Sequence, residues 1–345
     1  MDSSAIFSKI DLGDTNYSYA NTRVRAMESK ILTSDIYMKL LNMDVSQISR
    51  FLGEVEYKEE IDSLSKHFRG VELIERSLNK NLANTYNKLL KMAGKEAANY
   101  AFAVFMRWDV HNIISILRGK FAKVSDKEIE KTLIPIGEIP FSFIQSLTKF
   151  LSYQDVIRRL KKLEQFSFLN ETKEMADIES ELYKNYFTKV LEKFRKDKKS
   201  LFLNFVKMEI DIINLKNIMR MRRYGFTLDE EEKNVIDGGL YFKANKLSFL
   251  LRSSNQDFLT SIKKTPYGHI IEKHFSEPTL FNVEESLEIF LMQYAKKQLK
   301  GEHLSIIPIL HYIYLKKIEV DNIRKIARGI ASNLEKEVIQ DSLVI

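Results

Sequence analysis

The most informative part of this 345-residue chain is a ten-residue segment that occurs three times, first as Asp109-Val110-His111-Asn112-Ile113-Ile114-Ser115-Ile116-Leu117-Arg118. The second copy is Asp211-Ile212-Ile213-Asn214-Leu215-Lys216-Asn217-Ile218-Met219-Arg220, and the third is Glu319-Val320-Asp321-Asn322-Ile323-Arg324-Lys325-Ile326-Ala327-Arg328. Each copy has an acid at its first position, an asparagine three residues later and an arginine at its last position. Apolar residues at helical spacing lie between them, so each copy is expected to form a central helix with one face in a core.

The similarity extends beyond the ten residues. The first two copies are 102 residues apart, and the same offset pairs Gly137 with Gly239 downstream. Glutamates 75, 179 and 284 also correspond upstream of the three copies. A period near 100 residues is much longer than a solenoid unit of roughly 20 to 50 residues. We therefore predict three homologous helical-bundle domains, with boundaries at 1–122, 123–224 and 225–345.

The composition indicates an all-α protein. Only 12 glycines and 5 prolines occur in the chain, about 5% of the residues, against roughly 12% on average. A β-sandwich or barrel would need a turn about every 8 to 12 residues, and this chain has too few turn-forming residues for that. We therefore expect more than about 60% helix. The chain has no cysteine, which excludes disulfides, thiolate zinc sites, iron–sulfur clusters and a cysteine nucleophile.

Several local features follow from the same patterns. The first helix is expected to bury one stripe formed by Tyr19, Val24, Met27, Ile31 and Leu32. Further along, a helix is expected to start at Ser125-Asp126, a turn at 237–239 and a loop at 265–268.

Charge is unevenly distributed along the chain. Lys and Arg number 54 against 47 Asp and Glu, a net charge of +7, which is too small a surplus to indicate nucleic acid as the partner. The segment 123–224 holds 21 basic and 15 acidic residues and therefore carries most of the surplus. Its basic runs suggest a docking surface for an acidic protein, anionic lipid or a nucleic acid backbone, or simply a solvated face. The candidate partner-contact residues are Lys193, Arg195, Lys196, Lys198 and Lys199.

The polar members of the repeated segment have a definite geometry. At 100° per residue, the acid and the arginine nine residues later point to opposite sides of one helix, so they cannot pair with each other. We hypothesise that the acids and arginines reach neighbouring helices or neighbouring repeats. The alternative is that each is a solvated surface charge, because exposed ion pairs contribute only about 0 to 1 kcal/mol.

No pattern for catalysis, a metal or a cofactor is present. Gly94-Lys95-Glu96 and Gly119-Lys120-Phe121 lack the earlier glycine and the hydroxyl residue of a phosphate loop. The six histidines show no i, i+4 pair with a flanking glutamate, which a helical zinc site would need. Neither a secretory signal nor an apolar run of about 18 residues is seen, so a soluble or peripheral protein is expected.

The N-terminal segment carries a resemblance to a known family. Residues 19–32, Tyr-Ala-Asn-Thr-Arg-Val-Arg-Ala-Met-Glu-Ser-Lys-Ile-Leu, resemble the opening helix of the C subunit of archaeal and bacterial A/V-type ATP synthases, which is related to the d subunit of the eukaryotic vacuolar ATPase. The segment from Trp108 to Arg118 looks like the recurring helix motif of that family. Length, helicity and threefold repetition agree over the whole chain.

The resemblance implies three similar helical domains arranged as a funnel around a pseudo-threefold axis. It also implies a non-catalytic central-stalk protein that couples the membrane rotor ring of proteolipid subunits to the central shaft. It would act at the cytoplasmic face of the cell membrane as a peripheral protein, with no cofactor, no nucleic acid and no small-molecule substrate. The third copy departs from the pattern with Glu319 in place of Asp and Ala327 in place of a bulkier residue. A helical adaptor with a basic nucleic-acid-binding surface is the alternative function.

Overall fold

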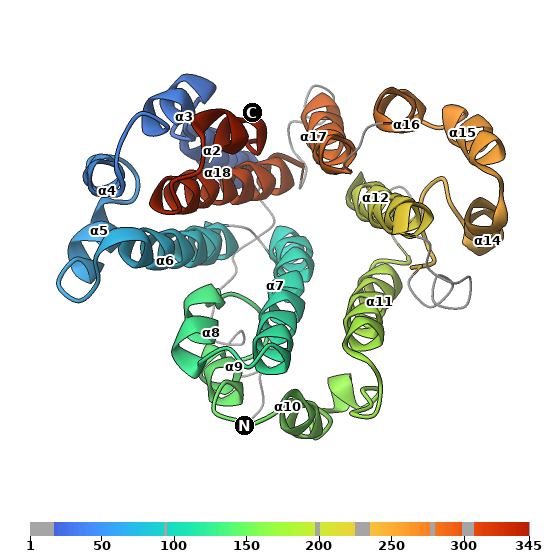
Figure 1. Ribbon diagram of the computed structural model, residues 1–345, viewed down its shortest axis with the longest axis horizontal. Coiled ribbons are helices and arrows are strands. Elements are labelled where there is room, and N and C mark those ends of the chain that lie inside the picture. Colours follow the sequence, from blue (N-terminus) through green and yellow to red (C-terminus); the bar gives the residue numbers. More distant parts are fainter. Residues whose placement is uncertain are drawn as a thin grey trace. The chain divides into compact units, whose positions relative to one another are not determined.

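The computed structural model describes residues 17–92, 95–196, 201–224, 235–276, 280–298 and 307–344. Helices account for 74% of these residues, and the described part of the chain contains no strand. Figure 1 shows this helical architecture. The prediction of an all-α protein with more than about 60% helix is confirmed.

The chain forms two compact units. Unit 1 combines Met1–Val156 with Leu299–Ile345, and unit 2 is Ile157–Gln298. The C-terminal part of the chain thus belongs to the same unit as the N-terminal part, whereas the sequence prediction divides the chain into three contiguous domains. Those three domains remain a prediction.

Unit 1 is built on three long helices and the first described helix. These are α6 (Gly70–Met92), α7 (Lys95–Phe121), α18 (Ile307–Ala331) and α2 (Tyr17–Glu28). Helix α18 packs against both α6 and α2, so this red helix from the C-terminal part of the chain lies beside the blue N-terminal helices (Figure 1). Its core position is expected from its apolar residues, since Ile309, Ile313, Val320 and Ile323 are all buried.

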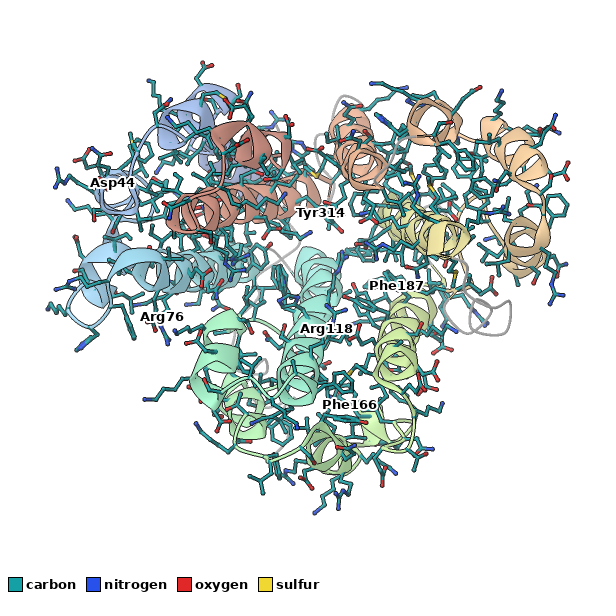
Figure 2. The ribbon with its side chains drawn as sticks, in the orientation of Figure 1. Asp44, Arg76, Arg118, Phe166, Phe187 and Tyr314 are labelled. Carbon is teal, nitrogen blue, oxygen red and sulfur yellow. The ribbon has the colours of Figure 1, made fainter. Side chains whose placement is uncertain are left out.

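Short helices surround these long ones. They are α3 (Ser34–Leu40), α4 (Val45–Leu52), α5 (Lys58–Leu64), α8 (Asp126–Thr132), α9 (Phe141–Leu147) and α19 (Lys336–Asp341). Helix α10 (Tyr153–Leu160) contains the boundary between the two units. Local signals set the starts of the short helices. Asp44, labelled in Figure 2, accepts from the Gln47 N–H at 2.8 Å while the Gln47 side chain accepts from the Asp44 N–H at 2.9 Å, a capping box at the start of α4.

Unit 2 has the same kinds of element. Its long helices are α11 (Met175–Lys193), α12 (Leu201–Tyr224) and α17 (Phe281–Gln298), and α12 packs against the other two. Its shorter elements are the 3₁₀ helix η1 (Glu164–Phe166) and helices α14 (Ala244–Arg252), α15 (Asn255–Lys263) and α16 (Gly268–His274).

Two of the repeated helices end in the same way. After α7, Lys123 has a φ of 56°, and after α18, Asn333 has a φ of 53°. The next N–H then donates back into the helix, from Val124 to the Gly119 carbonyl at 2.8 Å and from Leu334 to the Gly329 carbonyl at 2.9 Å. This shared ending turns the chain into α8 and α19, respectively.

The sequence expectations for the first helix are partly wrong. Helix α2 ends at Glu28, so Ile31 and Leu32 lie beyond it. Val24 is buried as expected, but Tyr19 is 57% exposed. The predicted helix start at Ser125-Asp126 is confirmed, because Ser125 is the N-cap of α8 and accepts from the Glu128 N–H at 3.4 Å.

Candidate functional site

The three asparagines of the repeated segment make the same contact. The side-chain amide of Asn112 donates to the carbonyl of Ile134 at 2.7 Å and accepts from the Ile134 N–H at 2.9 Å. Asn214 makes the same pair with Ile236, at 2.7 and 2.8 Å. Asn322 makes it with Val344, at 2.7 and 3.0 Å. Each partner lies 22 residues after its asparagine, so one side chain fixes the backbone of the following segment at the same point every time.

The first two acids also bind the following segment. Asp109 accepts from the N–H of Glu138 at 2.6 Å and of Ile139 at 3.3 Å. The second acid, Asp211, accepts from three consecutive N–H groups, those of Leu240, Tyr241 and Phe242, at 3.1, 2.8 and 3.2 Å. These donors lie 29 to 31 residues after the acids, just before the next short helix begins.

A glycine makes each of these two contacts possible. A Cβ atom on Gly137 would lie 1.9 Å from Oδ1 of Asp109, and one on Gly239 would lie 2.0 Å from Oδ1 of Asp211. Such distances are well below van der Waals contact, so a side chain at either glycine would displace the carboxylate. The sequence pairs these glycines at the 102-residue offset, and the structure supplies the reason for them.

The electrostatic environments of the two aspartates differ. Burial raises the pKa of Asp109 to about 8, and the N–H donors of Glu138 and Ile139 oppose this rise. Burial raises the pKa of Asp211 to about 6, and its backbone N–H donors and the hydroxyl of Tyr267 at 3.1 Å oppose this rise.

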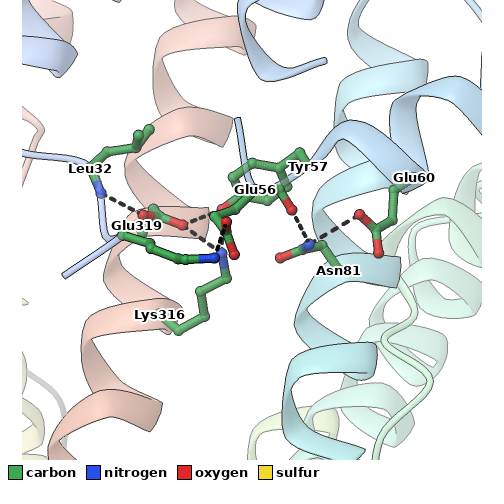
Figure 3. A network of polar contacts seen from close by, with 8 residues as sticks. Leu32, Glu56, Tyr57, Glu60, Asn81, Lys316 and Glu319 are labelled. Carbon is green, nitrogen blue, oxygen red and sulfur yellow. Dashed lines mark hydrogen bonds and ion pairs between the residues drawn. The ribbon is translucent and has the colours of Figure 1, made fainter. Parts of the chain in front are cut away.

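The third acid uses a different set of donors (Figure 3). Glu319 accepts from the N–H of Leu32 at 2.7 Å and from the hydroxyl of Tyr57 at 2.5 Å. Lys316, one turn earlier on α18, is 2.6 Å from the same carboxylate, and its side chain is only 4% exposed. Glu319 therefore pairs with a buried cation and links α18 to Leu32, which lies 287 residues earlier in the chain.

Two tyrosines have equivalent roles in these clusters. Tyr57 directly precedes α5, and Tyr267 directly precedes α16. Each is fully buried and donates its hydroxyl to the acid of a repeated helix. Burial and the adjacent acid raise the pKa of both tyrosines well above its usual value, so both stay protonated as donors. The sequence expectations do not include them; a Tyr placed immediately before a short helix in two repeats is the signal that could have revealed them.

The arginines point away from the acids, as the helix geometry requires. Arg220 pairs with Glu284 on α17 through two contacts of 2.6 and 2.5 Å, and Arg328 pairs with Glu75 on α6. Those glutamates are among the ones that the sequence aligns upstream of the repeats. Arg118, labelled in Figure 2, is exposed near the end of α7.

The repeated residues therefore divide into buried and exposed sets. Asp109, Asp211 and Glu319 are at most 5% exposed, and the three asparagines are fully buried. A solvated surface charge does not describe these acids, because their carboxylates accept hydrogen bonds inside the core. The three acids accept hydrogen bonds from backbone N–H groups and tyrosine hydroxyls of the fold. These hydrogen bonds indicate a structural role for the acids.

The basic candidates lie at the end of α11. Lys193, Arg195 and Lys196 are exposed, and Phe194 between them is buried. Lys198 and Lys199 lie outside the described residues. The segment 123–224 has a further basic run at its end, Arg220-Met221-Arg222-Arg223. Arg222 of this run is used within unit 2, because it donates to the carbonyls of Leu250 and Ser253.

Within the described residues, no group of three or more His, Asp or Glu side chains is placed to hold a metal ion. In the same part of the chain, no helix has both the length and the apolar character needed to cross a bilayer.

Fold and site together define a class of all-helical protein in which a repeated helix is bonded to the segment that follows it or to the start of the chain. Comparison with known proteins gives the family. The model of the ATP synthase (C/AC39) subunit family matches residues 20–342. The chain belongs to this family.

Individual relatives agree with the family model, and each is the C subunit of an A-type ATP synthase. The protein from Methanosarcina acetivorans is 36% identical, with 96% of this chain and 94% of that protein covered. The protein from Archaeoglobus fulgidus is 32% identical, with coverage of 95% and 96%. The Haloferax volcanii protein is 30% identical, with coverage of 96% and 99%.

Proposed function

We propose that this chain is the non-catalytic coupling subunit in the central stalk of a rotary A/V-type ATP synthase. In this role it links the central shaft to the membrane rotor ring, so that ion flow is coupled to ATP synthesis or hydrolysis. The supporting observation is the bonding of the repeated helices. Each has a buried acid and a buried asparagine that hold backbone or side chains of another segment.

Stiffness is the physical property that this role needs. A coupler passes torque between two bodies and loses work if its own helices shift under load. Close-packed interiors have low compressibility, and buried hydrogen bonds at fixed points resist sliding of one helix past another. Membership in the ATP synthase (C/AC39) subunit family supports the same role.

The arrangement that we propose is a funnel of three homologous domains around a pseudo-threefold axis, at the cytoplasmic face of the cell membrane and peripheral to it. The exposed cluster of Lys193, Arg195 and Lys196, with Lys198 and Lys199, is proposed as a docking surface for an acidic face of the ring or shaft. Complementary charge accelerates and orients docking over about a Debye length, roughly 8 Å at physiological salt.

The experiment is affinity capture of the tagged full-length chain from membranes solubilised in mild detergent. We expect the proteolipid ring subunits and the shaft subunits to be recovered with it. Capture in the presence of nuclease serves as the control, because the alternative function, a basic nucleic-acid-binding adaptor, predicts partners that nuclease and salt remove. Recovery of nucleic-acid-bound proteins without ring or shaft subunits would contradict the proposal.

A further inference from the structure

A pocket of about 510 Å³ lies within unit 1. Its walls are the C-terminal end of α2 with the residues just after it, the segment that leads into α5, one face of α6, and α18. The size is in the range of small-ligand sites, about 300 to 1,000 Å³. None of the roles derived above uses this pocket.

Asn81 provides a hydrogen-bond acceptor in this pocket. Its amide nitrogen donates to the Glu56 carbonyl at 2.9 Å and to the Glu60 carboxylate at 3.0 Å. A flipped amide would place its oxygen against two other oxygens, so the orientation is fixed. Asn81 is 7% exposed, and its Oδ1 atom is buried and has no hydrogen-bond partner. In Figure 3 this oxygen points from α6 toward Lys316 on α18, and both residues line the pocket.

The charges around Asn81 favour a cation. Lys316 is balanced by Glu319 at 2.6 Å, and Lys30 at the rim is paired with Glu56 at 2.8 Å. Glu60 is 3% exposed, and its carboxylate accepts from two neutral amides, those of Asn81 and Asn84. Among the ion pairs of the described residues, none includes Glu60.

The remaining charged residues of the pocket are at its rim. Lys58, Glu59 and Lys88 are exposed, so water screens them more than it screens the floor. The floor thus offers one buried carboxylate without a counter-ion and one acceptor without a donor. A group that carries positive charge and N–H donors satisfies both.

We propose that this pocket binds a cationic nitrogen donor, either an alkylammonium or a guanidinium group. Two sources have this chemistry: a lysine or arginine side chain of a neighbouring subunit, and a free polyamine. The inference concerns the isolated chain and does not depend on the proposed coupling function.

The test is an NMR titration of the full-length chain, with the methyl groups of Met27, Ile31 and Val55 in the pocket wall as reporters. The probes are n-butylammonium and ethylguanidinium, and butyrate is the anionic probe of similar length. We expect saturable shifts with both cations and at least tenfold weaker binding in Glu60→Gln. The matched control is Glu59→Gln at the exposed rim, where we expect less than a threefold change. Stronger shifts with butyrate than with the cations, or unchanged cation binding in Glu60→Gln, would overturn the proposal.

A rim variant keeps the test valid if Glu60→Gln fails to fold. Lys88→Glu changes an exposed side chain, and we expect it to tighten cation binding several-fold and to weaken any butyrate binding. Unchanged or weaker cation binding in Lys88→Glu would contradict the proposed site.

Spermidine separates the two sources. Binding of one spermidine per chain at micromolar concentration would assign the pocket to a free polyamine. Millimolar binding of all free cations, together with slower assembly of Glu60→Gln into the complex, would assign it to a side chain of a neighbouring subunit.

Discussion

The second and third repeated helices carry an acid at the same position but bond it to different parts of the chain. Asp211 closes onto three N–H groups 29 to 31 residues downstream. Glu319 closes onto Leu32 and Tyr57, which precede it by 287 and 262 residues. Each doubling of a closed loop costs only about 0.6 kcal/mol, so the longer closure adds roughly 2 kcal/mol. The acid of the same repeated segment can therefore bond either to the segment that follows it or to residues near the other end of the chain.

The largest effect is expected at the long-range closure. Glu319→Ala leaves the buried ammonium of Lys316 without its counter-charge, so we expect a loss of about 3 to 5 kcal/mol in the free energy of unfolding measured by urea denaturation. Asp211→Ala leaves N–H groups unpaired but no buried cation, and we expect a smaller loss of about 2 to 3 kcal/mol. Equal losses in the two variants would show that the two closures do not differ energetically. The double variant Lys316→Met, Glu319→Gln should recover part of the loss.

Glycine substitutions test how closely Asp109 and Asp211 pack against the segments that follow them. Gly137→Ala and Gly239→Ala would place a Cβ atom about 2 Å from a carboxylate oxygen, and we expect a destabilisation of about 1 to 3 kcal/mol from overpacking. Gly137 also has a φ of 141°, so its loss should be the larger of the two. The control is Gly70→Ala, where φ is 59° but no atom lies within 4 Å; backbone strain alone should cost about 1 to 2 kcal/mol there. Thermal unfolding of the three variants gives the ranking.

The asparagines should behave alike in all three repeats, in contrast to the acids. Asn214→Ala leaves the N–H and carbonyl of the buried Ile236 without a partner, and Asn322→Ala does the same to those of the half-buried Val344. We expect about 1 to 3 kcal/mol in each case. Hydrogen exchange should show faster exchange at Ile236 in the first variant and at Val344 in the second. An increase at only one of the two sites would show that the contacts are not equivalent.

The pH dependence should distinguish the two aspartates. Burial raises the folded-state pKa of both above the unfolded value, so the unfolded state binds fewer protons once the pH exceeds the unfolded pKa. Their contribution to stability is therefore fully present at low pH and falls as the pH rises. For Asp109 the fall should extend to about pH 8, and for Asp211 it should end near pH 6. The measurement is the stability of wild type relative to Asp109→Asn and Asp211→Asn, from pH 4 to 9.

The smallest effect on stability is expected at the exposed basic cluster. Reversal of Lys193, Arg195 and Lys196 to Glu should change the unfolding free energy by no more than about 0.5 kcal/mol per site, because these three residues are exposed. Assembly onto ring and shaft subunits should nevertheless be slower at low salt, and the difference should shrink as salt screens the charges. Assembly at the wild-type rate in low salt would make the cluster an ordinary solvated face.

The helical class and the repeated segment could be read directly from the sequence. Few glycines and prolines leave long helices unbroken, and apolar residues at helical spacing require a buried face. The opposite directions of acid and arginine follow from 100° per residue, and the buried Asp211 and exposed Arg220 agree with it. The repeat also places Gly137 and Gly239 at equivalent positions without any knowledge of their contacts.

The partners of those residues depend on the tertiary structure. Periodicity says which face of a helix is buried but not which backbone groups lie opposite it, because a hydrogen bond depends on the positions of two segments at once. The third copy has Glu319 where the second has Asp211, but this replacement does not reveal that Glu319 accepts from Leu32 and Tyr57 whereas Asp211 accepts from residues 240–242. The sequence alone therefore specifies three similar helices. The long-range packing that brings α18 beside α2 and α6 selects what each acid holds.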